Sequence, residues 1–132
     1  MRFFKQNANS RKAVIIVGHG SREKGFQAAM EKVASGIRKD GRFGEVVCAY
    51  LEITAPSIER AIERCVKKKA AQIRVLPYFV LTGNHVLYDI PGIVRQAAAR
   101  HSGKAKIILC PYLGYHPKLV AVVRQRIREG KP

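Results

Sequence analysis

The hydrophobic residues of this chain alternate between short continuous runs and longer stripes with helical spacing. The continuous runs occupy residues 13–17, 46–51, 73–79 and 107–110 and are rich in Val, Ile and Leu. Runs of this length are typical of strands that are buried on both faces of a sheet. Pro77 interrupts the third run, and because proline lacks a donor for the strand ladder, we expect that strand to bend or stop near it.

Each run is followed by a segment whose apolar residues recur every three or four positions. These stripes cover residues 26–37, 58–66, 90–98 and 119–127, and their spacing predicts amphipathic helices. We expect Pro56 and Ser57 to form the start of the second helix, and Pro117 to open the last one. A loop is expected between the third strand and Asp89.

A strand followed by a helix, four times over, predicts an α/β fold with a four-stranded parallel sheet and helices on both faces. Right-handed crossovers favour the strand order 2-1-3-4, as in flavodoxin-like sheets. The length of 132 residues suits one domain. We therefore predict a flexible polar leader over residues 1–11 and a single domain over residues 12–132.

The net charge of the chain indicates what kind of partner it binds. There are 25 Lys and Arg residues against 9 Asp and Glu residues, a formal net charge of +16. This charge predicts an anionic partner, which could be nucleic acid, a phosphate compound or a polycarboxylate. Nucleic acid is the less favoured partner, because no nucleic-acid-binding motif is recognisable and the aromatic residues do not gather with the basic ones.

The cysteines and the amino end indicate the compartment. Cys48, Cys65 and Cys110 are widely spaced and form no C-x-x-C pair, so they suggest buried, reduced thiols and neither a disulfide framework nor a structural zinc or iron-sulfur site. The first apolar run is too short for the core of a signal peptide. We predict a cytoplasmic protein that does not interact with membranes.

The candidate chemistry lies where two of the predicted strands end. Ligands of such sheets bind beyond the carboxyl ends of the strands at the point where the winding reverses, here between strands one and three. Strand one leads into Gly18-His19-Gly20-Ser21-Arg22, and strand three leads into Leu81-Thr82-Gly83-Asn84-His85. Glycine beside each histidine permits close approach of a ligand to the backbone, so the sequence predicts both imidazoles at one cleft.

Other interpretations of these residues stay open from the residues alone. The turn that contains His19 could bind phosphate through its backbone N–H groups and Arg22. A phosphate-handling enzyme with His19 as its nucleophile is one alternative function, and a basic nucleic-acid-binding module is another. We interpret His101 and His116 as ordinary solvated loop histidines.

Four motifs, in order along nearly the whole chain, resemble one family. They are Val17-Gly18-His19-Gly20-Ser21-Arg22, then Leu51-Glu52 with Pro56-Ser57-Ile58, then Gly83-Asn84-His85 with Asp89-Ile90-Pro91, and finally Pro111-Tyr112-Leu113-Gly114 with Pro117. The chain is similar to the small sirohydrochlorin chelatases of the cobalt and nickel type, which are class II chelatases. The resemblance implies an enzyme that inserts a divalent metal into sirohydrochlorin in cobalamin or related tetrapyrrole biosynthesis. Cobalt is the most strongly indicated metal, with nickel and iron as alternatives.

The resemblance also implies roles for particular residues. His19 would be the proton acceptor and a metal ligand, and His85 the second metal ligand. The segment that would line the tetrapyrrole consists of Val80, Leu81, Thr82, Gly83 and Asn84. Chains of this length in the family work as homodimers, so a homodimer is implied. The metal would be a co-substrate, with no permanently bound cofactor.

The chemistry of metal insertion adds two residues to these. Neutral imidazole can serve as base or ligand near neutral pH, since its reference pKa is about 6.5, and it accepts cobalt, nickel and iron. Arg22 is the cation best placed to meet a substrate carboxylate, and Glu52 is a possible proton relay.

Overall fold

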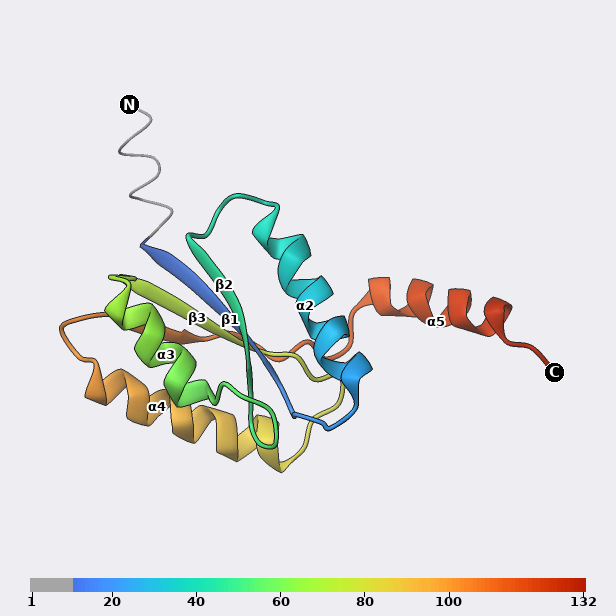
Figure 1. The fold of residues 1–132 in the computed structure, drawn as a ribbon. Helices are drawn as coiled ribbons and strands as arrows, with labels where there is room; N and C mark the ends of the chain where they lie inside the picture. The colour runs from blue at the N-terminus through green and yellow to red at the C-terminus, as the bar shows by residue number, and fades with distance from the viewer. Residues whose placement is uncertain (1–10) are drawn as a thin grey trace.

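The four apolar runs form the strands of one parallel sheet in the computed structural model, which describes residues 11–132 (Figure 1). The strands are β1 (Lys12–Gly18), β2 (Glu45–Tyr50), β3 (Gln72–Pro77) and β4 (Lys106–Leu109). Their order is β2-β1-β3-β4, which confirms the predicted topology. The third strand ends at Pro77, as expected. The predicted leader lies outside the described residues except for Arg11.

Four α-helices follow the strands, at the positions of the four stripes. They are α2 (Lys24–Arg38), α3 (Ile58–Lys67), α4 (Ile90–Arg100) and α5 (Pro117–Glu129). Helix α3 begins one residue after Ser57, whose hydroxyl accepts the backbone N–H of Arg60 at 3.2 Å and so caps the first turn. The expectation that Pro56 opens this helix was therefore wrong, because the capping residue follows it.

A second difference concerns the segment before α4, where a loop was predicted up to Asp89. Residues His85–Asp89 instead form a π-helical turn, η1. A hydrogen bond joins this turn to the segment before it, because the N–H of Leu87 donates to the carbonyl oxygen of Gly83 at 2.9 Å. His85 therefore sits on a helical turn that continues directly into α4.

The two faces of the sheet are covered to different extents. Helices α3 and α4 pack on one face, where Ile15, Ile62, Ile73 and Ile90 are fully buried. Helix α2 packs on the opposite face, mainly against β2, where Met30 contributes to a second, smaller cluster. Helices on both faces confirm the predicted fold class.

The last helix does not take part in this packing. Figure 1 shows α5 extending away from the body of the molecule, and none of its thirteen residues is buried. The apolar stripe over residues 119–127 is thus a correct helix prediction that covers no part of its own sheet. Within residues 11–132, no helix combines the length and apolar character that crossing a membrane requires.

Candidate active site

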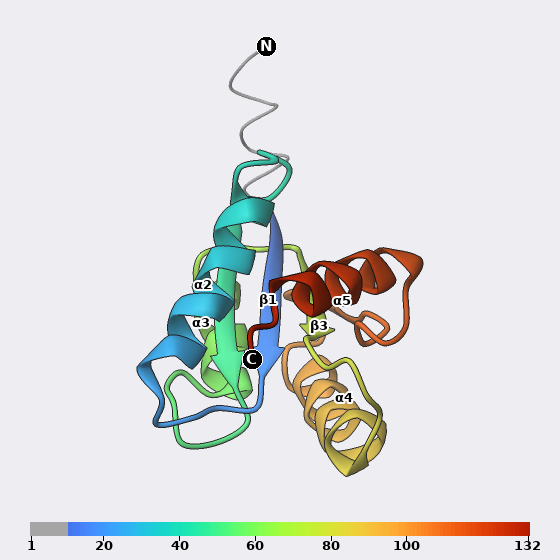
Figure 2. The same cartoon turned by 90° about the vertical axis from the view of Figure 1, so that its right-hand side faces the viewer.

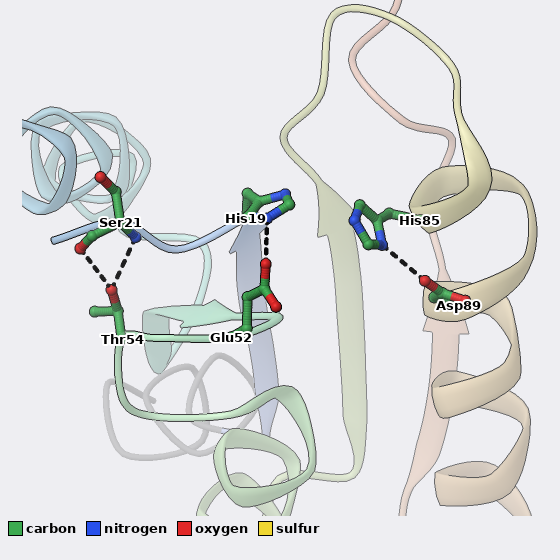
Figure 3. Close-up of polar contacts among 6 residues, drawn as sticks. All are labelled: His19, Ser21, Glu52, Thr54, His85 and Asp89. Atoms are coloured by element: carbon green, nitrogen blue, oxygen red, sulfur yellow. Dashed lines mark hydrogen bonds and ion pairs between the residues drawn. The ribbon is translucent and has the colours of Figure 1, made fainter.

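The two histidines singled out by the sequence lie side by side at the carboxyl edge of the sheet (Figure 3). His19 follows the last residue of β1, and His85 begins η1 after β3, which pairs with β1 in parallel. The centroids of their rings are 4.9 Å apart, and the ring planes meet at 76°, an edge-to-face arrangement. Both side chains are partly open to solvent. The predicted convergence of the imidazoles is present in the structure.

A carboxylate orients the first histidine. Oε1 of Glu52 lies 2.6 Å from Nε2 of His19. An ionised carboxylate can only accept a hydrogen bond, so Nε2 carries the proton and donates it. Nδ1 of His19 is then the nitrogen with a free lone pair.

Glu52 reaches His19 because the segment after β2 lies against the end of β1. The N–H of Leu51 donates to Gly18 O, and the N–H of Glu52 donates to His19 O, each at 3.1 Å. Beyond them, Thr54 Oγ1 accepts the N–H of Ser21 at 3.1 Å and donates to the carbonyl oxygen of Ser21 at 3.0 Å (Figure 3). Two backbone bonds and a threonine hydroxyl therefore hold the two segments together.

This close contact explains the glycine that follows His19. Gly20 has a φ of +107°, and a Cβ atom built there would lie 1.8 Å from the carbonyl oxygen of Glu52. Any side chain would push the two backbones apart. Gly20 is thus required by the approach between the segments that carry His19 and Glu52.

The second histidine is oriented from within its own turn. Nδ1 of His85 lies 2.7 Å from Oδ2 of Asp89, four residues further along η1. By the same argument Nδ1 donates, and Nε2 of His85 keeps its lone pair. Asp89 belonged to a motif but had no predicted role. The signal was its spacing, because side chains four residues apart on a helical turn are neighbours.

The other predicted site residues lie on the segments around these histidines. Arg22 follows the His19 turn and is exposed. The segment between β3 and η1 contains the predicted tetrapyrrole-lining residues, all of which are exposed: Val80, Leu81, Thr82, Gly83 and Asn84. The structure thus places them at the same edge of the sheet, open to a ligand.

The remaining histidines are outside the candidate site. His116 caps α5, where its Nδ1 accepts the N–H of Lys118 at 3.1 Å. His101 follows α4 and precedes β4, so it lies at the amino edge of the sheet, opposite His19.

The buried thiols Cys48 and Cys65 are poor metal ligands at neutral pH. All three cysteines are free; Cys48 and Cys65 are buried, as predicted, whereas Cys110 is partly exposed. Burial raises the pKa of Cys65 to about 11 and also raises the pKa of Cys48, so both remain protonated, whereas the thiolate is the form that binds metal. In the part of the chain that the structure describes, no three His, Cys, Asp or Glu side chains are grouped to hold a metal ion. The paired imidazoles are therefore the nitrogen donors that this edge offers.

Several known proteins are similar to this chain in sequence. The CbiX family model matches residues 13–130. The chain belongs to the CbiX family. It is 35% identical over 115 residues to the chloroplastic sirohydrochlorin ferrochelatase of Arabidopsis thaliana, a match that covers 87% of this chain and 51% of that protein. It is 26% identical to the sirohydrochlorin cobaltochelatase of Methanopyrus kandleri, with 89% of this chain and 96% of that protein covered.

A solved structure extends the likeness to three dimensions. The sirohydrochlorin chelatase SirB from Bacillus subtilis subspecies spizizenii, in complex with cobalt, has a TM-score of 0.80 and 31% identity to this CbiX-family chain. The match covers 89% of this chain and 50% of that one. The chain spans about half the length, or less, of several curated relatives that it matches. These matches bear out both the family resemblance and the fold class.

Proposed function

We propose that this CbiX-family chain is a chelatase that inserts a divalent metal into sirohydrochlorin. The observation that carries the proposal is the pair of imidazoles 4.9 Å apart, each hydrogen-bonded to its own carboxylate, at the carboxyl edge of the two central strands. Relatives named sirohydrochlorin cobaltochelatase and ferrochelatase support the substrate class. They lend no support to the alternatives of a phosphate-handling enzyme or a nucleic-acid-binding module.

The two histidines suit the two tasks of metal insertion. The reaction forms bonds from the metal to the ring nitrogens and releases two pyrrole protons. Nδ1 of His19 has the lone pair to accept a proton, and the resulting imidazolium is stabilised by Glu52 at its other nitrogen. Glu52, with 58% of its side chain exposed, can pass the proton on to water, which returns His19 to its neutral form to accept the second pyrrole proton. The same Nδ1 would first hold the metal, and its lone pair becomes free to accept the proton once the metal has moved to the ring nitrogens.

His85 is the second ligand for the incoming metal. Asp89 accepts its Nδ1–H, which fixes the orientation of the ring and leaves Nε2 available as a ligand. Imidazole accepts cobalt, nickel and ferrous iron and lacks the strong grip of thiolate. The metal is a substrate that must be released into the macrocycle, so two weak nitrogen ligands fit the task, and no permanent cofactor is required.

We propose cobalt as the delivered metal, with iron and nickel as alternatives, in cobalamin or related tetrapyrrole biosynthesis. Cobalt is supported by the cobaltochelatase relatives and iron by the ferrochelatase relatives. Genomic neighbours would identify the pathway. The cytoplasmic location remains a prediction, and we propose a homodimer as the working unit.

The exposed residues around the histidines would bind the macrocycle and its carboxylates. Apolar Val80 and Leu81 can contact the face of the ring, the adjoining residues 82–84 would line the same edge, and Arg22 can pair with a carboxylate.

The net charge of +16 would attract a polyanion from solution. Since salt screens such attraction over about 8 Å at physiological ionic strength, added salt should raise the KM for sirohydrochlorin more than it lowers kcat. A KM indifferent to salt would contradict this use of the charge.

The direct test is to incubate the purified protein with sirohydrochlorin and Co²⁺, Ni²⁺ or Fe²⁺ in turn and to follow the absorbance change of metallation. We expect insertion of at least one metal above the rate of a control without protein. The rate should be highest with Co²⁺ if cobalt is the delivered metal. Absence of catalysed insertion with all three would overturn the proposal.

A further inference from the structure

A shallow hollow of about 430 Å³ adjoins the candidate active site on the side of β2. It is lined by the segment after β2, which contains Glu52 and Ile53, and by Arg60 and Arg64 of α3. Figure 2 shows that segment beside the loop that follows β1, at the lower end of the sheet. Since Oε1 of Glu52 lies 2.6 Å from Nε2 of His19, a ligand held over the imidazoles can extend into the hollow.

The two arginines of the hollow have no acidic partner. Both side chains are exposed, and within residues 11–132 no carboxylate forms an ion pair with Arg60 or Arg64. Lys68, just after α3, differs, because its Nζ lies 3.4 Å from Oε2 of Glu45. Arg60 and Arg64 are four positions apart on one helix, a spacing at which like charges repel. An anion bound between them would relieve this repulsion.

Ile53, the apolar residue of the hollow, occupies a strained turn. The N–H of Thr54 donates to the carbonyl oxygen of Glu52 at 2.7 Å, and Ile53 between them has a φ of +69°. This is a γ-turn of the rare kind with a positive φ at its centre, a conformation that β-branched residues seldom adopt. The turn allows Glu52 to reach His19 while Thr54 bonds to the backbone of Ser21 (Figure 3).

These contacts explain the positive φ of the turn but not the choice of isoleucine. Glycine would adopt the same φ without strain. Burial within the chain does not compensate for the strain either, since Ile53 is 61% exposed. Backbone strain of this kind is concentrated at functional sites. An exposed aliphatic side chain beside Glu52 is suited to contact an apolar surface of a ligand.

We propose that this hollow binds one carboxylate arm of the tetrapyrrole, with Arg60 and Arg64 paired to the carboxylate and Ile53 against the apolar edge of the macrocycle. Two guanidinium groups and one aliphatic side chain match a ligand that is apolar at its centre and anionic at its rim. Ile53 and Leu81 follow the two strands that flank β1, so the ring would meet an exposed apolar side chain from each. The inference rests on the proposed function and assigns residues to its substrate.

Titration with metal-free sirohydrochlorin, followed by absorbance, tests the arginines separately from metal insertion. Arg60→Gln combined with Arg64→Gln should raise the Kd for sirohydrochlorin by about 10-fold, because charge-assisted hydrogen bonds to a carboxylate are lost. Lys104→Gln combined with Lys106→Gln is the matched control, since it removes two exposed charges at the amino edge of the sheet. The control should change the Kd by no more than about 2-fold, because distant exposed charges are screened.

Binding of Co²⁺ without sirohydrochlorin provides a second readout. The arginine double variant should bind Co²⁺ like the wild type, because both imidazoles are unchanged. In the insertion assay it should raise the KM for sirohydrochlorin and leave kcat nearly unchanged. A double variant that binds sirohydrochlorin like the wild type, or that loses Co²⁺ affinity to the same extent, would overturn the subsite.

Ile53→Gly separates the strain from the contact. Loss of the strain should raise the urea midpoint of unfolding, while loss of the side chain should raise the Kd for sirohydrochlorin by about 5-fold through the apolar area no longer buried. Ile53→Ala should weaken binding similarly with a smaller gain in stability, because alanine is still strained at positive φ. An Ile53→Gly protein that is less stable than the wild type, or that binds sirohydrochlorin equally well, would overturn the role of Ile53.

The subsite and the proposed function can fail separately. A wild type that inserts a metal, together with variants that bind sirohydrochlorin normally, overturns the subsite alone. A wild type that binds sirohydrochlorin but inserts none of the three metals overturns the proposed function, and the titrations then decide the subsite. A wild type that does not bind sirohydrochlorin overturns both.

Discussion

The two histidine segments reach similar geometry by different means. His19 is oriented by Glu52, a residue 33 positions later that arrives from the end of another strand. His85 is oriented by Asp89, four positions later in the same helical turn. The first arrangement depends on how two segments pack, and the second depends on one turn of backbone. Damage to packing should therefore disturb His19 far more than His85.

The glycines of the two segments show the same contrast. A Cβ atom on Gly20 would collide with the backbone of Glu52, whereas one on Gly83 would meet no atom within 4 Å. Gly20 also has a positive φ that other residues rarely adopt. A glycine near a histidine thus marks a close backbone contact in one segment, and in the other it marks open space that a ligand could occupy.

The largest effect should come from removing the imidazoles. His19→Ala is expected to lower the rate of metal insertion by about 10³-fold, since it removes a base and a ligand together, and general bases contribute roughly 10²- to 10⁴-fold. His85→Ala removes a ligand alone and should cost less. Steady-state kinetics would be measured beside circular dichroism, which should show an unchanged fold. A His19→Ala enzyme with the wild-type rate would rule out its assigned role.

Gly20→Ala and Gly83→Ala form the next pair. The first should reduce the free energy of unfolding by about 2–4 kcal/mol, because it combines backbone strain with a collision, and it should lower activity by displacing Glu52. The second should change the free energy of unfolding by no more than about 0.5 kcal/mol. Urea unfolding of both proteins would measure the difference. Equal stability of the two variants would contradict the close contact at Gly20.

Loss of the Asp89 carboxylate should have an intermediate effect. Asp89→Ala is expected to lower activity or metal affinity by about 10- to 100-fold, as is usual when the partner of a ligating histidine is lost. Asp89→Asn should recover part of this loss, because its amide oxygen can still accept from Nδ1 of His85. Titration with Co²⁺, followed by absorbance, would separate lost affinity from slow transfer. An Asp89→Ala protein that binds and inserts cobalt normally would remove Asp89 from the site.

The smallest effect should come from Thr54→Val, which removes both bonds to the backbone of Ser21. We expect a loss of about 1–2 kcal/mol in the free energy of unfolding, with a modest fall in kcat as the Glu52 segment loosens. Thr82→Val is the matched stability control on the His85 side, where the side chain is exposed, and should leave the free energy of unfolding nearly unchanged. Comparable losses in the two variants would show that the Thr54 bonds do not hold the segments together.

Much of this molecule could be predicted from local pattern. In residues 11–132, continuous apolar runs and helical stripes predicted each strand and α-helix within a few residues, since the periodicity of burial can be seen in neighbouring sequence positions. The strand order followed from the handedness of short crossovers. That order placed His19 and His85 at one edge, because the carboxyl ends of adjacent parallel strands meet there.

What the tertiary structure alone decided is which groups meet. No local pattern joins Glu52 to His19 or Thr54 to Ser21, because those contacts depend on how the end of β2 folds against the end of β1. The π-helical form of the His85 turn arose from backbone bonding that the sequence did not signal. The apolar stripe of α5 predicted an amphipathic helix, but helical periodicity does not indicate which part of the structure the apolar face contacts. Where α5 points was decided by the hydrogen bonds that tie its connection to β3, which lie outside the helix itself.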